Sequence, residues 1–181
     1  MQNVKLQFEK KNNDYRIREA FKTLRSNIEF CGGDVKVIAV TSCTPNEGKS
    51  SVAMEMARAF AEAGSKTMLI DADMRKSVLV GRYKTGDVRK GLTHGLIGKA
   101  NYLEVMLETN VPNLYVTFSG PVPPNPSELL GGEKFRSILN VLRSSFDYVI
   151  VDTPPLGSVI DAAVAAMSCD GTVLVIESKV I

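Results

Sequence analysis

Apolar positions along this 181-residue chain fall into short runs that are almost uninterrupted. A strand with one solvated face alternates apolar and polar residues, whereas a strand buried on both faces reads as a continuous apolar run. The pattern therefore predicts five buried strands. They are VKVIAV (35–40), KTMLI (66–70), NLYVTF (113–118), DYVIV (147–151) and TVLVIE (172–177).

Segments with helical spacing separate these runs. In the first segment, Ile17, Phe21, Leu24 and Ile28 recur at intervals of four, three and four residues and form one apolar stripe. Helices are expected at 15–30, 49–63, 133–146 and 159–167. Alternating strands and helices predict an α/β fold with a doubly wound, mostly parallel sheet, whose ligands bind beyond the carboxyl ends of the strands. Residues 1–13 are polar and are expected to form a disordered arm before a single domain at 14–181.

Composition narrows the class of protein. With 44% apolar and 23% charged residues, the chain is average for a globular protein, and its apolar runs are far shorter than the ~20 residues that span a bilayer. The polar N-terminus does not resemble a signal peptide. Three cysteines, an odd number without metal-ligand spacing, indicate reduced thiols in the cytosol. A net charge of +2 gives no case for a nucleic-acid partner.

The segment between the first strand and the second predicted helix, CTPNEGKSS, resembles a phosphate-binding loop. Gly48, Lys49 and Ser50 match the pattern G-x-x-x-x-G-K-[S/T], but Cys43 replaces the first glycine. Backbone N–H groups and a helix N-terminus bind phosphate whatever the side chain, so this replacement is tolerable. Asn46 is a residue type that accepts positive φ where such a loop needs it. The alternative is a chance Gly-Lys-Ser at the start of a helix.

Carboxylates follow two other predicted strands. Asp71 and Asp73 lie two residues apart after the second strand, so in an extended segment both would point toward the phosphate-binding loop. Asp152 follows the strand at 147–151, where nucleotide hydrolases place a carboxylate that orients Mg²⁺ through water. Each residue alone could be an ordinary turn or cap residue. Together with the loop, they predict one site.

These motifs resemble those of the bacterial tyrosine kinase family, the kinases that control capsular and exopolysaccharide synthesis. The loop, LIDADMRK and DYVIVDTPP are similar to its Walker A, Walker A′ and Walker B motifs, and EAFKTLRSNIEF and GPVPPNPSELL also match over roughly residues 14–178. The resemblance implies a P-loop NTPase fold with a deviant Walker A motif. It also implies transfer of the ATP γ-phosphoryl group to tyrosines, mainly in the Tyr-rich tail of a neighbouring copy.

The resemblance assigns roles to residues of this chain. Lys49 and Ser50 would bind phosphate and Mg²⁺, Asp71 would activate the tyrosine hydroxyl, Asp73 would support Mg²⁺ and Lys49, and Asp152 would orient a metal-bound water. The set implied for ATP is Pro45, Asn46, Glu47, Gly48, Lys49, Ser50 and Ser51. The set implied for Mg²⁺ is Ser50, Asp73 and Asp152.

The resemblance also implies partners. The family's E-x-x-R-x-x-R helix builds a ring of subunits, and here Glu19, Lys22 and Arg25 occupy these positions, with lysine in place of the first arginine. A solvated charged face is the alternative for these three residues. The expected partners are a transmembrane activator of polysaccharide export, further copies of the chain and Tyr-containing proteins, which would place the kinase in the cytoplasm and hold it at the membrane through its partner.

Departures from the family keep other functions open. The tyrosines are scattered, Ser77 stands where the family usually has proline, and the chain stops after the fifth predicted strand, which would leave that strand partly uncovered. We therefore expect a domain that is incomplete at its C-terminus. The alternatives are a non-catalytic ATP-sensing subunit of an export complex, and a partitioning-type ATPase. The second lacks support, because Thr44 occupies the position of its signature lysine.

Overall fold

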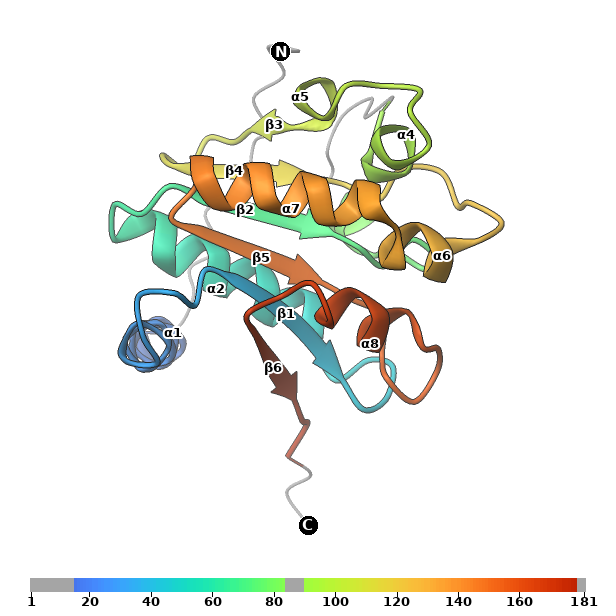
Figure 1. The fold of residues 1–181 in the computed structure, drawn as a ribbon. Coiled ribbons are helices and arrows are strands. Elements are labelled where there is room, and N and C mark those ends of the chain that lie inside the picture. The colour runs from blue at the N-terminus through green and yellow to red at the C-terminus, as the bar shows by residue number, and fades with distance from the viewer. Residues whose placement is uncertain (1–14, 84–89, 179–181) are drawn as a thin grey trace.

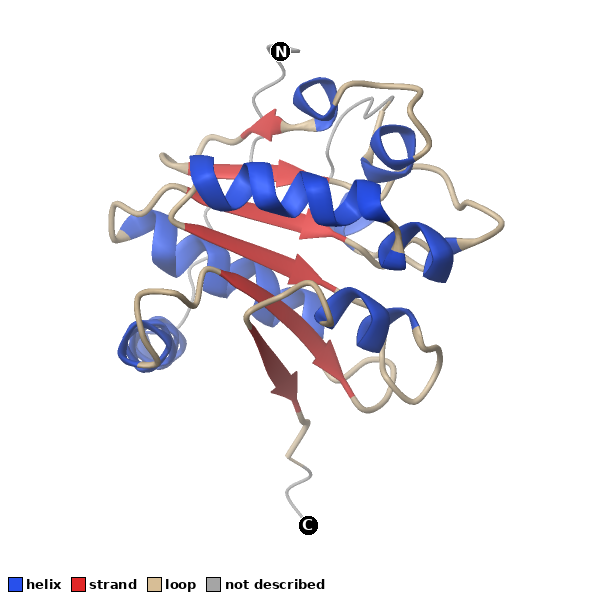
Figure 2. Ribbon diagram, in the orientation of Figure 1, coloured by secondary structure: helices blue, strands red, loops and turns tan. Residues whose placement is uncertain are grey.

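The computed structural model describes residues 15–83 and 90–178, which form a six-stranded sheet with helices on both faces (Figures 1 and 2). The strand order is β3-β4-β2-β5-β1-β6. Neighbouring strands are parallel except for β3, which pairs with β4 in the antiparallel sense. This order confirms the predicted doubly wound α/β fold. The N-terminal arm expected at 1–13 lies outside the described residues.

Five of the strands correspond to the predicted apolar runs. They are β1 Val37–Ser42, β2 Thr67–Asp71, β4 Leu114–Thr117, β5 Tyr148–Asp152 and β6 Gly171–Val175. The pattern does not predict β3 Leu107–Glu108, because two residues carry no readable period. Every residue of β1 and β2 is buried, which explains why these strands read as continuous apolar runs.

The four predicted helices are present, together with four short ones. The long helices are α1 Tyr15–Phe30, α2 Lys49–Glu62 and α7 Glu133–Ser145, and the fourth predicted helix is α8 Asp161–Ala166. The additional helices are α3 Leu79–Arg82, α4 Leu92–Leu96, α5 Tyr102–Val105 and α6 Pro126–Gly131. Helices α1 and α2 lie on one face of the sheet, and α7 and α8 lie on the other (Figure 1).

Each face of the sheet carries an apolar layer. On the α2 face, Phe60 is fully buried and stacks on Tyr148 with 3.9 Å between the ring centroids. On the α7 face, Phe135, Ile138 and Leu142 are buried, and their spacing of three and four residues places them on one side of the helix. Burying one such side chain stabilises the fold by about 1.5–3 kcal/mol. The two layers hold the central strands in fixed register.

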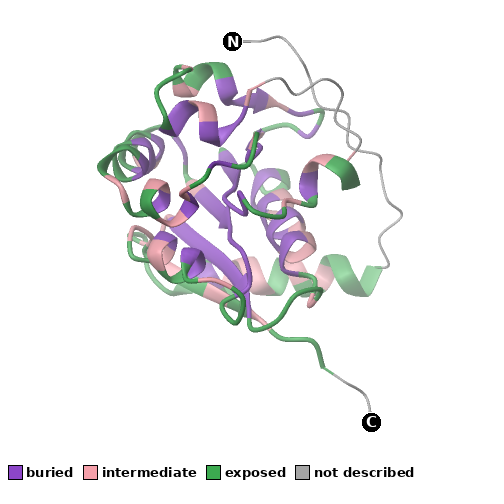
Figure 3. Ribbon diagram, turned by 90° about the vertical axis from the view of Figure 1, so that its right-hand side faces the viewer, coloured by how far each residue is buried: buried purple, intermediate pink, exposed green. Residues whose placement is uncertain are grey.

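Helix α1 is the least buried of the long helices (Figure 3). Of its predicted apolar stripe, Ile28 is buried and Phe21 and Leu24 pack against the core, but Ile17 is 45% exposed. The edge strand β6 alternates half-buried and exposed residues, which confirms the expectation that it is partly uncovered. No helix within residues 15–83 and 90–178 is long and apolar enough to cross a membrane.

Three central strands end side by side and so define the site. Strands β2 and β5 pair in parallel with Asp71 opposite Asp152, and β5 and β1 pair with Asp152 opposite Val40. Ser42 ends β1 only two residues further on. The loop after β1 and the carboxylates after β2 and β5 therefore meet at one edge of the sheet, as the rule for parallel sheets predicts.

Candidate active site

The loop between β1 and α2 has the backbone geometry of a phosphate-binding loop. Asn46 has φ of 70° and Gly48 has φ of 86°, so the prediction that Asn46 takes a left-handed conformation is confirmed. Glu47 Oε2 accepts a hydrogen bond of 2.7 Å from the Thr44 amide, and this bond lowers the pKa of the Glu47 carboxyl. The loop thus keeps its shape without a glycine at its first position.

A close backbone contact supports the start of this loop from outside. The Gly157 amide donates a hydrogen bond of 3.0 Å to the Cys43 carbonyl oxygen. A Cβ atom at position 157 would lie 2.6 Å from the same oxygen, so only glycine fits there. The sequence reading misses Gly157, because nothing in the pattern indicates which glycine approaches the loop across 114 residues of chain.

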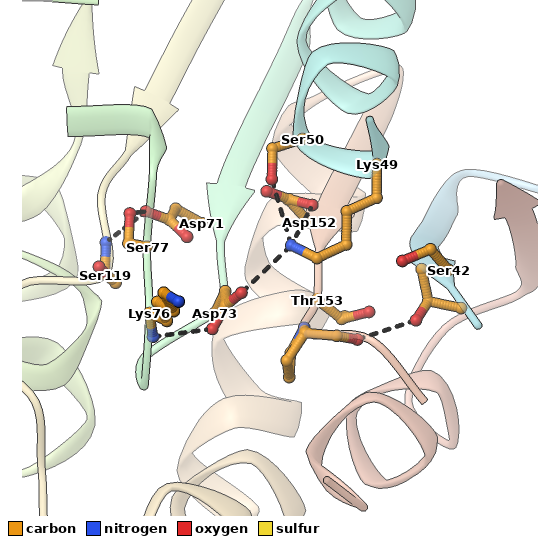
Figure 4. A network of polar contacts seen from close by, with 12 residues as sticks. Ser42, Lys49, Ser50, Asp71, Asp73, Lys76, Ser77, Ser119, Asp152 and Thr153 are labelled. Atoms are coloured by element: carbon orange, nitrogen blue, oxygen red, sulfur yellow. Dashed lines mark hydrogen bonds and ion pairs between the residues drawn. The ribbon is translucent and has the colours of Figure 1, made fainter. Parts of the chain in front are cut away.

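Lys49 lies at the centre of a buried charge cluster at the start of α2 (Figure 4). Its ammonium is 3.1 Å from Asp73 Oδ2 and 3.7 Å from Asp152 Oδ1, and it donates a hydrogen bond of 3.2 Å to the Ser50 hydroxyl. The Lys49 side chain is only 10% exposed. The structure therefore brings together four of the predicted site residues, Lys49, Ser50, Asp73 and Asp152.

Asp71 points elsewhere, and the expectation that it faces the loop beside Asp73 is wrong. Its Oδ2 accepts hydrogen bonds from the Ser77 hydroxyl and, at 3.4 Å, from the Ser119 amide (Figure 4). The expectation assumes an extended chain, but β2 ends at Asp71 and the chain then turns, with Met74 N bonded to Ala72 O at 2.9 Å. Asp71 therefore contacts Ser77 and Ser119, whereas Asp73 contacts Lys49.

Two of the carboxylates are held in surroundings that disfavour their charge. Burial raises the pKa of Asp71 to about 7, and the negative charge of Asp152 adds to this effect. Burial likewise raises the pKa of Asp152 to about 6, against the opposing charge of Lys49. Asp71 Oδ1 and both carboxylate oxygens of Asp152 are buried and accept no hydrogen bond of good geometry from the described residues. Such oxygens fit a site that receives a cation or its bound water.

A cavity of about 190 Å³ opens beside this cluster. Its lining includes Asn46, Gly48, Lys49, Ser50 and Asp73, which all belong to the sequence-predicted site. Pro45 also lines it, whereas Glu47 and Ser51 belong to the same turn without lining the cavity. A second cavity, of about 660 Å³, lies beyond the 74–77 segment and is lined by both partners of Asp71, Ser77 and Ser119.

An ion pair that the sequence does not reveal fixes one wall of the first cavity. Arg75 Nε and Nη2 donate hydrogen bonds of 2.7 and 3.1 Å to the two carboxylate oxygens of Asp161, which is fully buried. The Ser127 hydroxyl also donates to Asp161. These residues come from the turn after β2 and from α8 and α6, so the pairing joins segments that are 86 and 34 residues apart.

This ion pair also bears on a cluster of six basic residues between Arg75 and Lys90, whose composition favours a solvated loop over a docking patch. Arg75 is fixed by Asp161, Arg82 contacts Ser51, and Lys90 forms an ion pair of 2.8 Å with Glu104. These three side chains are solvent-accessible, and each also has a defined partner. Lys76 lines the first cavity, and the two remaining basic residues, at 84 and 89, lie outside the described residues.

The three residues predicted for subunit contacts divide into two groups. Glu19 and Lys22 form an exposed ion pair of 2.7 Å on the outer side of α1. Arg25 instead turns toward the protein, where Nη1 donates a hydrogen bond of 3.2 Å to the Ala59 carbonyl of α2 and Nε lies 3.5 Å from Glu29. Arg25 therefore helps to dock α1 onto α2, and Glu19 and Lys22 remain exposed.

Comparison with known proteins identifies relatives over most of the chain. A family model described as an AAA domain matches residues 35–180. The tyrosine-protein kinase CpsD of Streptococcus agalactiae is 47% identical over 160 residues, which make up 88% of this chain and 70% of that protein.

Two solved structures are similar at the level of the whole fold. The chimerical protein CapA2B2 matches with a TM-score of 0.85 and 34% identity, covering 94% of this chain and 79% of its own. The kinase domain of the Escherichia coli tyrosine kinase ETK matches with a TM-score of 0.83 and 34% identity, covering 87% of this chain and 62% of its own. This chain therefore belongs to the AAA-domain family and, within it, to the bacterial tyrosine-protein kinases.

Proposed function

We propose that this protein transfers the γ-phosphoryl group of ATP to tyrosine hydroxyls of proteins. The position of Lys49 is the main support for this proposal. Lys49 begins α2 and lines the cavity, and its ammonium lies between the carboxylates of Asp73 and Asp152. A buried cation at a helix N-terminus, next to a loop with the backbone geometry of a phosphate-binding loop, is complementary to a polyphosphate. Its family membership supports the same reaction.

The residues present fit ATP and Mg²⁺. ATP supplies the transferable phosphoryl group, and Mg²⁺ supplies charge neutralisation. Lys49 and the loop from Pro45 to Ser51 would hold the phosphates, and Ser50, Asp73 and Asp152 would hold Mg²⁺ directly or through water. Within the described part of the chain, no three His, Cys, Asp or Glu side chains are grouped to hold a metal on their own. A magnesium ion here would complete its octahedral shell with phosphate oxygens and water.

We further propose that Asp71 receives the tyrosine proton from the side of the second cavity. Its hydrogen-bond partners Ser77 and Ser119 line the second cavity, whose wall also includes Phe118 and Val122. A lining that contains both apolar and polar side chains suits a phenol, which has an apolar ring and a hydroxyl at its end. With its pKa raised to about 7, the Asp71 carboxyl can hold the proton that the tyrosine hydroxyl releases near neutral pH.

We further propose a setting for this reaction, in capsular or exopolysaccharide synthesis, with a transmembrane activator that holds the kinase at the membrane. The family membership supports this setting. Self-association into a ring is part of the same proposal, and the exposed ion pair of Glu19 and Lys22 on α1 is available for it. Charge reversal of both residues, followed by measurement of molecular mass by light scattering, tests the ring without touching the nucleotide cavity.

A single assay tests the central proposal. The purified chain is incubated with ATP, Mg²⁺ and a Tyr-rich peptide, and phosphotyrosine, ADP and molecular mass are measured together. If the wild-type protein forms phosphotyrosine and Lys49→Met does not, the result supports the proposed kinase activity. ATP hydrolysis coupled to dimerisation would instead indicate a partitioning-type ATPase, and nucleotide binding without turnover would indicate a sensing subunit.

A further inference from the structure

Helix α3 brings a second cationic side chain to the first cavity from outside the recognised motifs. The helix is one turn long and is anchored by Leu79, which is fully buried in the apolar core. Arg82 ends this turn, and its amide is bonded to the Val78 carbonyl at 3.0 Å. The backbone of Arg82 is therefore fixed relative to the core, and its side chain lines the cavity with Gly48, Lys49 and Ser50.

The guanidinium of Arg82 is directed at the phosphate-binding loop. Its Nη1 donates a hydrogen bond to the hydroxyl of Ser51, which directly follows Lys49 and Ser50 in the first turn of α2. Lys49 approaches the cavity from the side of Asp73 and Asp152. Both cations therefore lie at the first turn of α2, but Lys49 contacts Asp73 and Asp152 whereas Arg82 contacts Ser51.

Among the described residues, no carboxylate pairs with Arg82. Arg75 pairs with Asp161, and Lys49 pairs with Asp73 and Asp152, but Arg82 forms no ion pair within residues 15–83 and 90–178. The cavity lining contains four cationic side chains, Lys49, Arg75, Lys76 and Arg82, and one carboxylate, Asp73. An unbalanced guanidinium beside a phosphate-binding loop is complementary to the phosphate chain of a nucleotide, which a planar fork of N–H donors can bind in bidentate fashion.

We propose that Arg82 is a nucleotide-binding residue that contacts the phosphate chain from the α3 side of the cavity. The inference rests on the proposed function, because it requires a nucleoside polyphosphate in this cavity. It adds a contact outside the three Walker-type motifs, supplied by a helix that the sequence pattern does not predict. The side chain is exposed, so solvent weakens the contact, and we expect a contribution of about tenfold in affinity.

The test measures binding of ADP with Mg²⁺, by competition against a fluorescent ADP analogue, in Arg82→Gln, Arg82→Lys and Arg136→Gln. Arg136 is the matched control, because it is also exposed and also bonds a neutral oxygen, that of Gly131, but lies on α7 away from the cavity. We expect Arg82→Gln to raise the Kd for ADP about tenfold, Arg82→Lys to recover part of the loss, and Arg136→Gln to match the wild type. The loss should shrink as KCl is raised, because the contact is ionic.

The outcomes separate this inference from the proposed function. A wild-type protein that binds no ADP would contradict the proposed function itself. Normal binding in Arg82→Gln, with binding lost in Lys49→Met, would overturn only the role of Arg82. Equal losses in Arg82→Gln and Arg82→Lys, independent of salt, would also overturn it, because they would show that Arg82 acts through packing rather than charge.

Discussion

Replacing Asp71 by asparagine should stabilise the nucleotide-free protein at alkaline pH. The Asp71 carboxyl is fully buried, and its pKa is raised from 3.8 to about 7. Between these two values the folded state holds a proton that the unfolded state has released. The stability linked to this proton is therefore complete below about pH 4 and is lost as the pH rises through 7.

The magnitude follows from the same two values. From pH 5 to about pH 7 the wild-type protein loses about 1.4 kcal/mol per pH unit, or about 3 kcal/mol in all, to the ionisation of Asp71. Asparagine does not titrate, and its side-chain oxygen can still accept hydrogen bonds from Ser77 and Ser119. The free energy of unfolding of Asp71→Asn should therefore fall by about 3 kcal/mol less than that of the wild type between pH 5 and pH 8.

Urea unfolding at pH 5 and pH 8, without nucleotide or Mg²⁺, measures this difference. Asp34→Asn is the control, because Asp34 is exposed. The charge of Asp152 contributes to the raised pKa of Asp71, so the difference between the two profiles reports the titration of Asp71 together with its coupling to Asp152. Profiles of Asp71→Asn and wild type that run parallel from pH 5 to pH 8 would refute the reasoning, since they would show that Asp71 is ionised in the folded protein throughout this range.

Three further substitutions have defined outcomes. Lys49→Met should abolish phosphotyrosine formation in the peptide assay while the far-UV circular dichroism stays unchanged; undiminished labelling would contradict the role of Lys49. Gly91→Ala should lower the free energy of unfolding by about 2 kcal/mol or more in urea, because the new Cβ would lie 2.4 Å from Gly120 N; a smaller loss would show that the backbones at Gly91 and Gly120 can move apart. Arg75→Gln should lower the free energy of unfolding in the same measurement, because the Asp161 carboxylate then loses its cation; an unchanged free energy of unfolding would show that Ser127 suffices to hold Asp161.

The sequence predicts the centre of this fold better than its periphery. Strands β1, β2 and β5 are buried on both faces, and strands of this kind need apolar residues at almost every position. The continuous apolar runs that result are easily recognised in the sequence. Helices α3 to α5 have four or five residues each, too few to show a helical period. Their positions depend on contacts between distant segments, such as the bonds of Leu92 and Thr93 to residues 118 and 119.

The site shows the same division. Lys49, Asp73 and Asp152 are predictable, because each follows directly from a strand end and a local motif. Local spacing cannot show that Asp71 turns toward Ser119, since that orientation is decided by the turn after β2 and by a segment 48 residues away. Local spacing also cannot predict the role of Asp161, because its partner Arg75 lies 86 residues away in the sequence.

The hydrogen bond from the Thr44 amide to the Glu47 carboxylate has a consequence for the rate at which a ligand binds. The loop is already folded back on itself by its own carboxylate, and Asn46 and Gly48 already hold their left-handed angles. An incoming phosphate would therefore meet amides that need no rearrangement, so little conformational entropy would be lost on association. Capture should then be limited by diffusion and charge, and selectivity should be expressed mainly in how slowly the bound molecule leaves.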